Sequence, residues 1–369
     1  IAALTFLATW LLLGDVQEAL TRGVTVMVVF CPCALALATP TSIMAAIGQA
    51  AKFGVIIKSG EALERMARVD TVCFDKTGTV TTGRLGVTDV EGEETLALAR
   101  ALESSSEHPL AKAIVAAGGD APVETVENWT MQPGRGVAGD IGGRRVFCGT
   151  AEWVAPAMRR LDETSRLRKD GKAVVFVGTA DEYIGCIALA DTIRAEAAET
   201  VAECRKASLR PVLLTGDHAE NAGYAAAQAG IDEVHASLLP EGKAAAIETM
   251  QKNGNVVCMV GDGVNDALAL ETADVGIAMG GAGTDIAVEA ADIALVGDDI
   301  SSIAYLKRLG AGCVNLIKLN IAISMCINFV AICCSVAGIL TPVTGALVHN
   351  AGSVLVVLNG ALLYDRNFR

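Results

Sequence analysis

Charged residues are scarce in this sequence, and in two long stretches they are missing altogether. Only 19% of the 369 residues are charged, whereas 52% are hydrophobic. No Asp, Glu, Lys or Arg occurs between Arg22 and Lys52, or between Lys318 and Asp365. Because about 20 apolar residues suffice for a helix to cross a bilayer, we expect both stretches to lie in a membrane. A buried core helix is the alternative interpretation of either stretch alone.

A basic surplus is also lacking. The net charge is −13, and most of it falls between residues 53 and 318. Nucleic-acid binding is therefore excluded, since phosphate backbones require a basic surface. The 11 cysteines do not show the even spacing of secreted disulfide-rich domains, which favours a reducing compartment over a disulfide framework.

Residues 1–13 are apolar but too short to span a bilayer, and no basic segment precedes them as in a signal peptide. We interpret them as the end of a membrane helix in a fragment of a longer protein. Further spans are expected at 24–46, with its helix continuing toward Gly54, and at 319–338 and 342–362. Pro342 marks the turn between the last two, because proline cannot continue a helix.

Basic residues flank one side of these spans, and the positive-inside rule makes that side cytoplasmic. The loops that connect the spans on the other side hold a single basic residue, Arg22. The flanking residues are Lys52, Lys58, Lys307, Arg308, Lys318, Arg366 and Arg369.

Between the membrane stretches the sequence alternates like an α/β domain. Short apolar runs at 71–74, 213–214 and 256–260, bounded by Gly and Asp, are typical of buried parallel strands. Alanine-rich amphipathic runs at 194–206 and 242–251 are expected to be crossover helices. The scattered glycines of 134–149 instead predict tight antiparallel strands, and hence a second subdomain.

Asp75 heads the run Asp-Lys-Thr-Gly-Thr directly after the first strand. A carboxylate at the carboxyl end of a buried parallel strand lies where α/β folds place reacting groups, and it can attack the γ-phosphate of ATP to form an aspartyl-phosphate. An ordinary turn after a strand is the alternative. The run resembles the signature of P-type ATPases, within the haloacid-dehalogenase-like superfamily, and implies catalytic roles for Lys76 and Thr77 as well.

Three further blocks fit this resemblance in the right order, each after an apolar run. Thr215, Gly216 and Asp217 would surround the phosphate, and Lys243 would neutralise charge on the transferring phosphoryl group. Asp262, with Asp75 and Thr77, is the implied Mg²⁺ site. The resemblance gives Asn265 and Asp266 supporting roles.

A nucleotide site is implied between these blocks. The segment 106–109 (Ser-Glu-His-Pro) and the pair of glycines at 134 and 136 resemble the nucleotide-binding subdomain of heavy-metal pumps. In that family Glu103, His108, Gly134 and Gly136 would surround the adenine and ribose of ATP. A histidine that caps a helix is the alternative for His108 alone.

Cys31-Pro32-Cys33 falls inside a predicted span. Proline opens the helix backbone, and intramembrane polar groups are usually functional. Thiolates select soft or borderline cations such as Cu⁺, Zn²⁺ or Cd²⁺, although small-residue packing is an alternative. The motif resembles that of the heavy-metal P-type ATPases.

The last two spans depart from the best-known subgroups of that family. Copper(I) pumps carry Tyr-Asn and Met-x-x-Ser-Ser, whereas zinc and cadmium pumps carry a Lys and an Asp. Here Asn328 fits the copper pattern, and His349 stands where zinc pumps place Asp. We expect Asn328 and His349 to join Cys31 and Cys33 around the transported ion. Nitrogen and oxygen donors favour a divalent ion such as Zn²⁺ or Mn²⁺, and copper(I) stays the alternative. Cys326, Cys333 and Cys334 are interpreted as packing residues.

The resemblance covers essentially the whole chain. It implies membrane helices at 1–52, an α/β haloacid-dehalogenase-like (Rossmann-type) phosphorylation domain at 53–89 and 182–312, an inserted α+β nucleotide-binding domain at 90–181, and two membrane helices at 313–369. The family's Thr-Gly-Glu motif, which belongs to an actuator domain, does not occur here. We expect that domain, with earlier helices, before residue 1.

The function implied is ATP-driven transport of a transition metal across a prokaryotic plasma membrane, with ATP and Mg²⁺ as cofactors. A cytosolic metal donor is an allowed partner. Two rival classes remain open. A soluble phosphatase of the same superfamily would carry a second Asp where Thr77 stands, and a potassium or calcium pump would lack Cys31 and Cys33.

Overall fold

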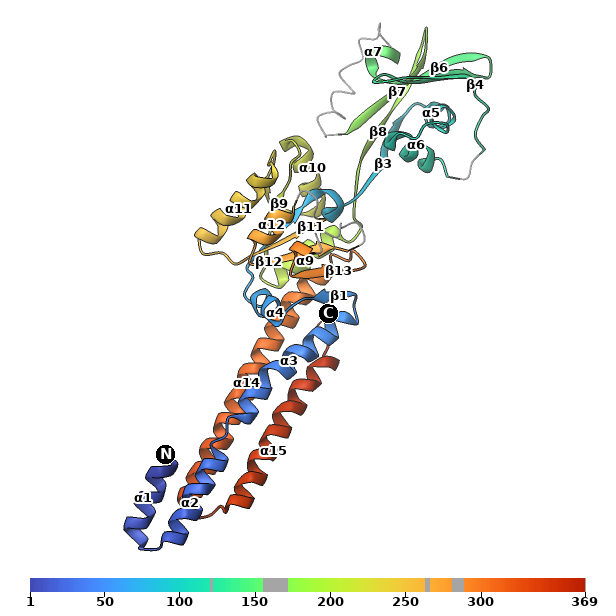
Figure 1. The fold of residues 1–369 in the computed structure, drawn as a ribbon. Coiled ribbons are helices and arrows are strands. Elements are labelled where there is room, and N and C mark those ends of the chain that lie inside the picture. Colours follow the sequence, from blue (N-terminus) through green and yellow to red (C-terminus); the bar gives the residue numbers. More distant parts are fainter. Residues whose placement is uncertain (120–121, 155–171, 263–265, 281–288, 369) are drawn as a thin grey trace. The chain divides into compact units, whose positions relative to one another are not determined.

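The computed structural model describes residues 1–119, 122–154, 172–262, 266–280 and 289–368. The chain divides into two compact units (Figure 1). One unit comprises Ile1–Asp70 and Ala291–Arg369, and the other comprises Thr71–Ala290.

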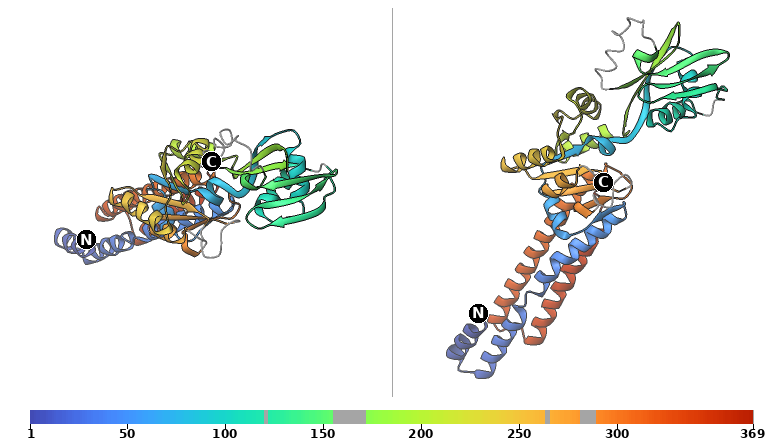
Figure 2. Two further views of the ribbon diagram at one scale, coloured as in Figure 1. Left: turned by 90° about the horizontal axis from the view of Figure 1, so that it is seen from above. Right: turned by 45° about the horizontal axis from the view of Figure 1, so that its top comes forward.

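The first unit is largely a bundle of apolar helices. Helices α3, α14 and α15 pack against one another and run side by side (Figures 1 and 2). Three helical segments, Val16–Ala51, Ser302–Val336 and Pro342–Asp365, are long and apolar enough to cross a membrane. The helices are α1 (Ala2–Leu13), α2 (Val16–Val29), α3 (Cys33–Ala51), α14 (Ser302–Val336) and α15 (Pro342–Ala361), followed by the 3-10 turn η2 (Leu362–Asp365).

Local sequence explains where these helices begin. The Asp15 carboxylate accepts a hydrogen bond from the backbone N–H of Gln17 (2.8 Å), so α2 is capped at its first turn. Thr341 and Thr344 form a reciprocal capping box in front of α15, which begins at Pro342. Small residues allow close packing, since a Cβ added at Gly360 of α15 would lie 3.1 Å from the Ser42 hydroxyl of α3.

The observed helices differ from the predicted spans at their ends. The polar residues after Gly14 belong to α2 from Val16 onward, so the turn is shorter than expected. The predicted span 24–46 is two helices, because the chain leaves helical geometry between Val29 and Cys33. The predicted span 319–338 is the second half of α14, which starts at Ser302. Hydropathy detects the apolar part of a helix but not its continuation beyond that part.

The first unit also contains a two-stranded pairing and a short helix in addition to the bundle. Strand β1 (Val55–Ile57) pairs antiparallel with β13 (Ile293–Leu295). Helix α4 (Gly60–Met66) is capped by the Ser59 hydroxyl, which accepts from the Ala62 N–H. It packs against α14.

The second unit contains a parallel sheet with the order β12-β11-β2-β9-β10. Its central strands are fully buried, as their uninterrupted apolar runs predict. The strands are β2 (Thr71–Asp75), β9 (Arg210–Leu214), β10 (Glu233–His235), β11 (Val257–Gly261) and β12 (Val275–Met279). The helices are α9 (Ala197–Lys206), α10 (Ala219–Ala229), α11 (Pro240–Lys252) and α12 (Ala267–Thr272).

A second, antiparallel sheet in this unit has the order β3-β8-β7-β6-β5-β4. Helices α5 (Thr95–Glu103) and α6 (Pro109–Ala117) cover one face of it (Figure 1) and share a buried core with its strands. Its strands are β3 (Thr81–Glu91), β4 (Glu127–Gln132), β5 (Gly136–Ile141), β6 (Arg144–Gly149), β7 (Ala173–Thr179) and β8 (Tyr183–Ile193), with the short helix α7 (Ala151–Val154) after β6. The antiparallel strands expected in 134–149 are thus β5 and β6, and β3 and β8 extend the sheet beyond residues 90–181.

Candidate functional site

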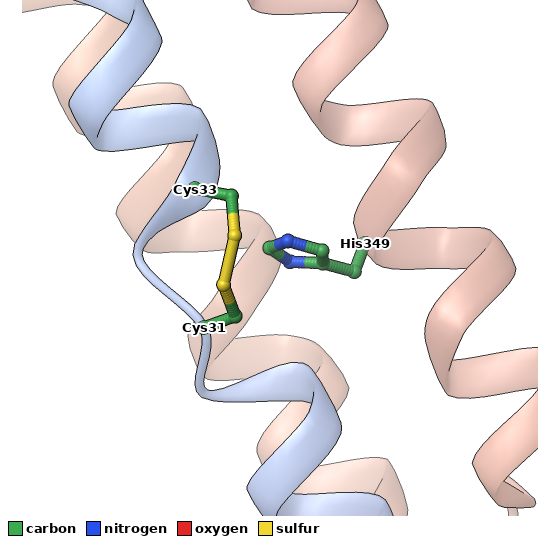
Figure 3. A group of neighbouring side chains, drawn as sticks. All are labelled: Cys31, Cys33 and His349. Atoms are coloured by element: carbon green, nitrogen blue, oxygen red, sulfur yellow. A yellow bond between two sulfur atoms is a disulfide. The ribbon is translucent and has the colours of Figure 1, made fainter.

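Two thiol-bearing residues and one imidazole meet in the helical unit where the chain breaks between α2 and α3. Cys31 lies in the break and Cys33 begins α3, while His349 comes from α15. The ligand atoms of these three residues lie within 4.8 Å of one another. Figure 3 shows the imidazole pointing at the two sulfur atoms. The structure therefore brings together three of the four residues expected around the transported ion.

The two sulfurs are joined as a disulfide (Figure 3), which corrects the expectation of free thiols. With only Pro32 between them, the Cα atoms are 5.5 Å apart, which is within the usual range for a bridged pair. Metal binding requires thiolates, so the disulfide has to be reduced before both sulfurs can act as ligands. The other nine cysteines are free thiols, as the sequence predicts.

His349 is only 8% exposed, and its Nε2 has no hydrogen-bond partner among the described residues. A buried polar atom without a partner is costly, which makes Nε2 a natural ligand atom. The Ser353 hydroxyl donates to the His349 carbonyl at 3.1 Å, so this serine serves its own helix.

Asn328 lies half-buried on α14. The preceding residue, Ile327, faces α15, since a Cβ added at Gly352 would lie 3.5 Å from its side chain. Because the next residue on a helix points about 100° away, this contact places Ile327 against α15 and does not place the Asn328 side chain at the cluster. Cys326, Cys333 and Cys334 do not belong to the cluster of sulfur and imidazole ligands.

A second site lies at the carboxyl end of β2 in the other unit. Asp75 ends this strand and is 5% exposed. The Lys243 ammonium, from the first turn of α11, donates to Asp75 Oδ1 at 2.5 Å and to Asp266 Oδ1 at 2.6 Å. Carboxylate oxygens of Asp75, Asp262 and Asp266 lie within 4.8 Å of one another.

This cluster perturbs the titration of its members. Burial raises the pKa of Asp75 to about 7, Asp266 adds to the rise, and Lys243 opposes it. Burial acts to lower the pKa of Lys243, but Asp75 and Asp266 outweigh it, so the pKa is raised. Lys243 therefore stays charged between two buried carboxyl groups.

The same carboxylates fit a Mg²⁺ ion, which prefers oxygen ligands. Gly78 makes the approach of Asp262 possible, because it has a φ of +73° and a Cβ there would lie 2.7 Å from Asp262 Oδ2. Thr77, expected at the same ion, is exposed in the turn η1 (Lys76–Val80). Asn265 lies outside the described residues.

The remaining expected catalytic residues line the same end of the parallel sheet. Lys76 forms an ion pair with Asp217. Thr215 is buried, and its hydroxyl accepts from the Asp217 N–H at 3.1 Å. Gly216 packs closely against the chain, because a Cβ added there would lie 3.2 Å from the Leu238 carbonyl oxygen.

Arg194 is a residue of this site that sequence reasoning missed. Its guanidinium donates to the carbonyls of Thr79 and Gly78, each at 2.9 Å. It thereby fixes the turn that follows Asp75. Its acceptors are backbone atoms, which leave no trace in the pattern of residue types, so no sequence signal identifies it.

A cavity of about 360 Å³ lies at the antiparallel sheet, and all four expected nucleotide residues line it. His108 caps α6, with Nδ1 accepting from the Leu110 N–H at 3.3 Å, so a neutral ring carries its proton on Nε2. The capping role and the pocket role are thus compatible. Met131, Arg135, Thr150 and Val174 also line the cavity and were not identified from sequence.

The pocket depends on close backbone packing. Gly136 has a φ of +143°, and a Cβ there would lie 2.1 Å from the Cys148 carbonyl. The Thr150 N–H donates to the Arg135 carbonyl at 2.8 Å and holds the glycine turn against β6. Glu103 also lines the cavity. Burial raises the pKa of its carboxyl group, and the Cys148 thiol donates a hydrogen bond to it at 3.5 Å.

Comparison with known proteins finds a matching family model and several relatives of this chain. Residues 69–274 match the haloacid dehalogenase-like hydrolases. The chain is 40% identical to a manganese-exporting P-type ATPase of Mycobacterium tuberculosis, with 96% of this chain and 51% of the relative covered. It is 42% identical to a copper-exporting P-type ATPase of the same organism, with 98% and 48% covered.

Among solved structures, a zinc-transporting PIB-type ATPase in its E2.Pi state superimposes with a TM-score of 0.88 at 35% identity. The match covers 98% of this chain and 61% of the solved chain. The chain thus spans about half the length of the curated relatives it matches.

Proposed function

This chain belongs to the haloacid dehalogenase-like hydrolases, in the branch formed by the heavy-metal P-type ATPases, and we propose that it couples ATP hydrolysis to the transport of a divalent transition metal. The observation that carries the transport proposal is the buried His349 imidazole, whose Nε2 has no hydrogen-bond partner among the described residues and whose ring points at Cys31 and Cys33. The protein is an integral membrane protein, with three segments long and apolar enough to span a bilayer.

Asp75 is the proposed nucleophile. One of its carboxylate oxygens attacks the γ-phosphorus of ATP, the bond to the β–γ bridging oxygen breaks, and ADP leaves. Lys243 contacts Asp75 at 2.5 Å and so neutralises charge that builds up on the transferring group. Mg²⁺ held by Asp75 and Asp262 would shield the phosphate oxygens. Lys76 and Thr215 stand at the same end of the sheet.

ATP is proposed to bind in the cavity beside β5 and β6. Gly134 and Gly136 let the ligand approach the backbone, and His108 Nε2–H and Glu103 offer a donor and an acceptor. Apolar contact with Met131 and Val174 suits the flat face of a purine.

The metal-binding form has Cys31 and Cys33 reduced. Two thiolates, the His349 imidazole and the Asn328 side-chain oxygen give the mixed donor set that a divalent ion uses. Copper(I) needs only two or three soft ligands, so the imidazole would add little for it. We therefore propose Zn²⁺ or Mn²⁺ as the cargo.

The proposed location is a prokaryotic plasma membrane, with the α/β parts in the cytoplasm. A cytosolic metal donor would deliver the ion. An actuator domain would supply the group that assists hydrolysis of the aspartyl-phosphate, as the resemblance implies.

The function is tested by ATPase activity of the transporter containing this chain, measured under reducing conditions with Zn²⁺, Mn²⁺, Cd²⁺, Co²⁺ and Cu⁺. Zn²⁺ or Mn²⁺ should stimulate more than Cu⁺. Asp75→Asn should abolish the acid-stable, hydroxylamine-labile phosphoenzyme in every condition. A normal level of this adduct in Asp75→Asn would disprove the nucleophile.

His349→Ala should reduce stimulation at least as severely as Asn328→Ala, because an imidazole is the stronger ligand. Ser353→Ala is the matched control on α15, since its hydroxyl only bonds the helix backbone. Stimulation by Cu⁺ alone that survives His349→Ala would instead identify a copper pump.

A further inference from the structure

Helix α14 is one uninterrupted helix of 35 residues, Ser302–Val336, and serves two regions of the first unit. Toward its end it carries Asn328, and the preceding residue, Ile327, lies against α15, the helix that carries His349. Near its start it packs against α4. At a rise of 1.5 Å per residue, a displacement at either end is carried about 50 Å along the helix axis.

One side chain fixes the contact with α4. The Lys307 ammonium donates to the backbone carbonyls of Ala67 at 2.8 Å and Val69 at 2.6 Å. These two carbonyls lie directly after the last turn of α4, where a cation is favourable because carbonyl groups point out of the helix end.

The backbones of the two helices also approach closely at this point. A Cβ added at Gly310, one turn after Lys307, would lie 2.8 Å from the Leu63 carbonyl and 3.0 Å from the Ala67 nitrogen. Any larger residue at Gly310 would therefore separate α14 from α4. The contact between α14 and α4 thus combines close backbone packing at Gly310 with the charged hydrogen bonds of Lys307.

The segment that Lys307 contacts is followed in the chain by β2, the strand that ends at the proposed nucleophile. Val69 is 1% exposed, Asp70 follows it, and β2 runs from Thr71 to Asp75. The carbonyl that accepts the shorter of the two hydrogen bonds is therefore six residues before the proposed nucleophile.

We propose that Lys307 is a positioning residue that couples occupancy of the metal site to phosphorylation of Asp75. Movement of α14 when the ion binds is passed through the Lys307 ammonium to residues 67–69 and along the chain to β2. The proposal rests on the proposed transport function. A cap that only stabilises α4 is the competing explanation.

The test compares Lys307→Met, which keeps the unbranched stem of the side chain but donates no hydrogen bond, with Lys307→Arg, which retains charge and donors. Lys318→Met is the matched control, because Lys318 is an exposed cation on the same helix. Three quantities are measured in the membrane-inserted transporter: Zn²⁺ and Mn²⁺ binding, ATP binding, and metal-stimulated phosphoenzyme formation.

Lys307→Met should keep both binding affinities within about twofold and lose about tenfold in metal stimulation, the size of a typical coupling between two sites. Lys307→Arg and Lys318→Met should resemble the wild type. Unchanged stimulation in Lys307→Met overturns the proposal. A parallel loss of metal binding, ATP binding and stimulation also overturns it, because a purely structural cap predicts that loss.

Gly310→Ala provides a second variant should Lys307→Met not fold. It should reproduce the loss of stimulation with both binding affinities retained, whereas Gly223→Ala, at a helical glycine with open space around it, should not. If the wild type itself is not stimulated by any metal, the proposed transport function fails and this inference falls with it. Stimulated wild type with normally stimulated variants contradicts the coupling role alone.

Discussion

At the scale of single residues, Lys243 is the group on which the phosphorylation site depends. Its ammonium lies between the buried carboxyl groups of Asp75 and Asp266, at 2.5 and 2.6 Å. Without it, two like charges would face each other in a region from which water is excluded. In a buried ion pair each charge stabilises the other. Removing one partner therefore costs more free energy of unfolding than the whole pair contributes, because a buried charge is left without a counter-charge.

Lys243→Met should therefore destabilise the unit Thr71–Ala290 by about 3–5 kcal/mol. The loss should grow as the pH rises from 5 to 8. Burial already raises the pKa of Asp75 to about 7, so the protonated carboxyl relieves the repulsion at low pH and the stabilising proton is lost as the pH rises. Urea unfolding at several pH values measures this.

Lys252→Met is the control on the same helix, where the exposed Lys252–Glu248 pair (3.1 Å) should be worth no more than about 0.5 kcal/mol. Adding Asp266→Asn to Lys243→Met should recover part of the stability. A Lys243→Met protein as stable as the wild type would show that the carboxylates are not held together as the structure has them.

The sequence was informative about residues whose type carries the chemistry. Asp75 and Asp262 each follow an apolar run, and parallel strands place such residues at one edge of a sheet. Arg194 was not predictable, because it acts on the carbonyls of Gly78 and Thr79. The cysteine pair was located correctly, but its bridged state was not, since spacing alone does not give the distance between two sulfurs across a helix break.

At the scale of elements, the nucleotide cavity depends on the hairpin of β5 and β6. Gly136 pairs with Gly149 across it, and a Cβ on either would meet backbone atoms of the facing strand. The two glycines therefore set the shape of the turn that lines the cavity.

Residues 81–193, which contain every strand of the antiparallel sheet, should bind ATP without Mg²⁺. Gly136→Val or His108→Ala should weaken binding by about 1–3 kcal/mol, the scale of one lost hydrogen bond or close approach. Gly142→Asn is the control, because Gly142 has a φ of +57° with open space around it and asparagine tolerates that conformation. Calorimetric titration measures the affinities, and unchanged values in both variants would place the nucleotide elsewhere.

Element ends were the least predictable part of the fold. The apolar run 319–338 was identified, but α14 begins 17 residues earlier, because its first turns pack against protein and carry Lys307 and Arg308. Strand β3 was likewise not expected, since its exposed polar residues do not resemble a buried strand. Both elements are defined by tertiary packing that residue type does not reveal.

At the scale of the whole molecule, the distribution of charge predicts orientation. The basic residues cluster at one end of the membrane segments, and Arg22 is the exception. Its guanidinium donates to Glu18 and to the Val336 carbonyl at the end of α14, so this charge is satisfied within the protein and does not argue for the opposite orientation.

Protease added to sealed inside-out vesicles should therefore digest the unit Thr71–Ala290, whereas right-side-out vesicles should protect it. Immunoblotting of that unit gives the result, and detergent-opened right-side-out vesicles provide the control for accessibility. Digestion in sealed right-side-out vesicles would reverse the assigned orientation.

The interruption of the backbone between Val29 and Cys33 places two helix ends of opposite polarity beside the cysteine pair. A helix end leaves its last carbonyls without intrahelical partners and bears a partial negative charge, while a helix start bears a partial positive one. A cation beside Cys31 and Cys33 is therefore drawn toward α2 and repelled by α3. The peptide dipoles at the break therefore hold a cation at the carbonyl end of α2, beside the two cysteines, and do not drive it in either direction along the membrane segments.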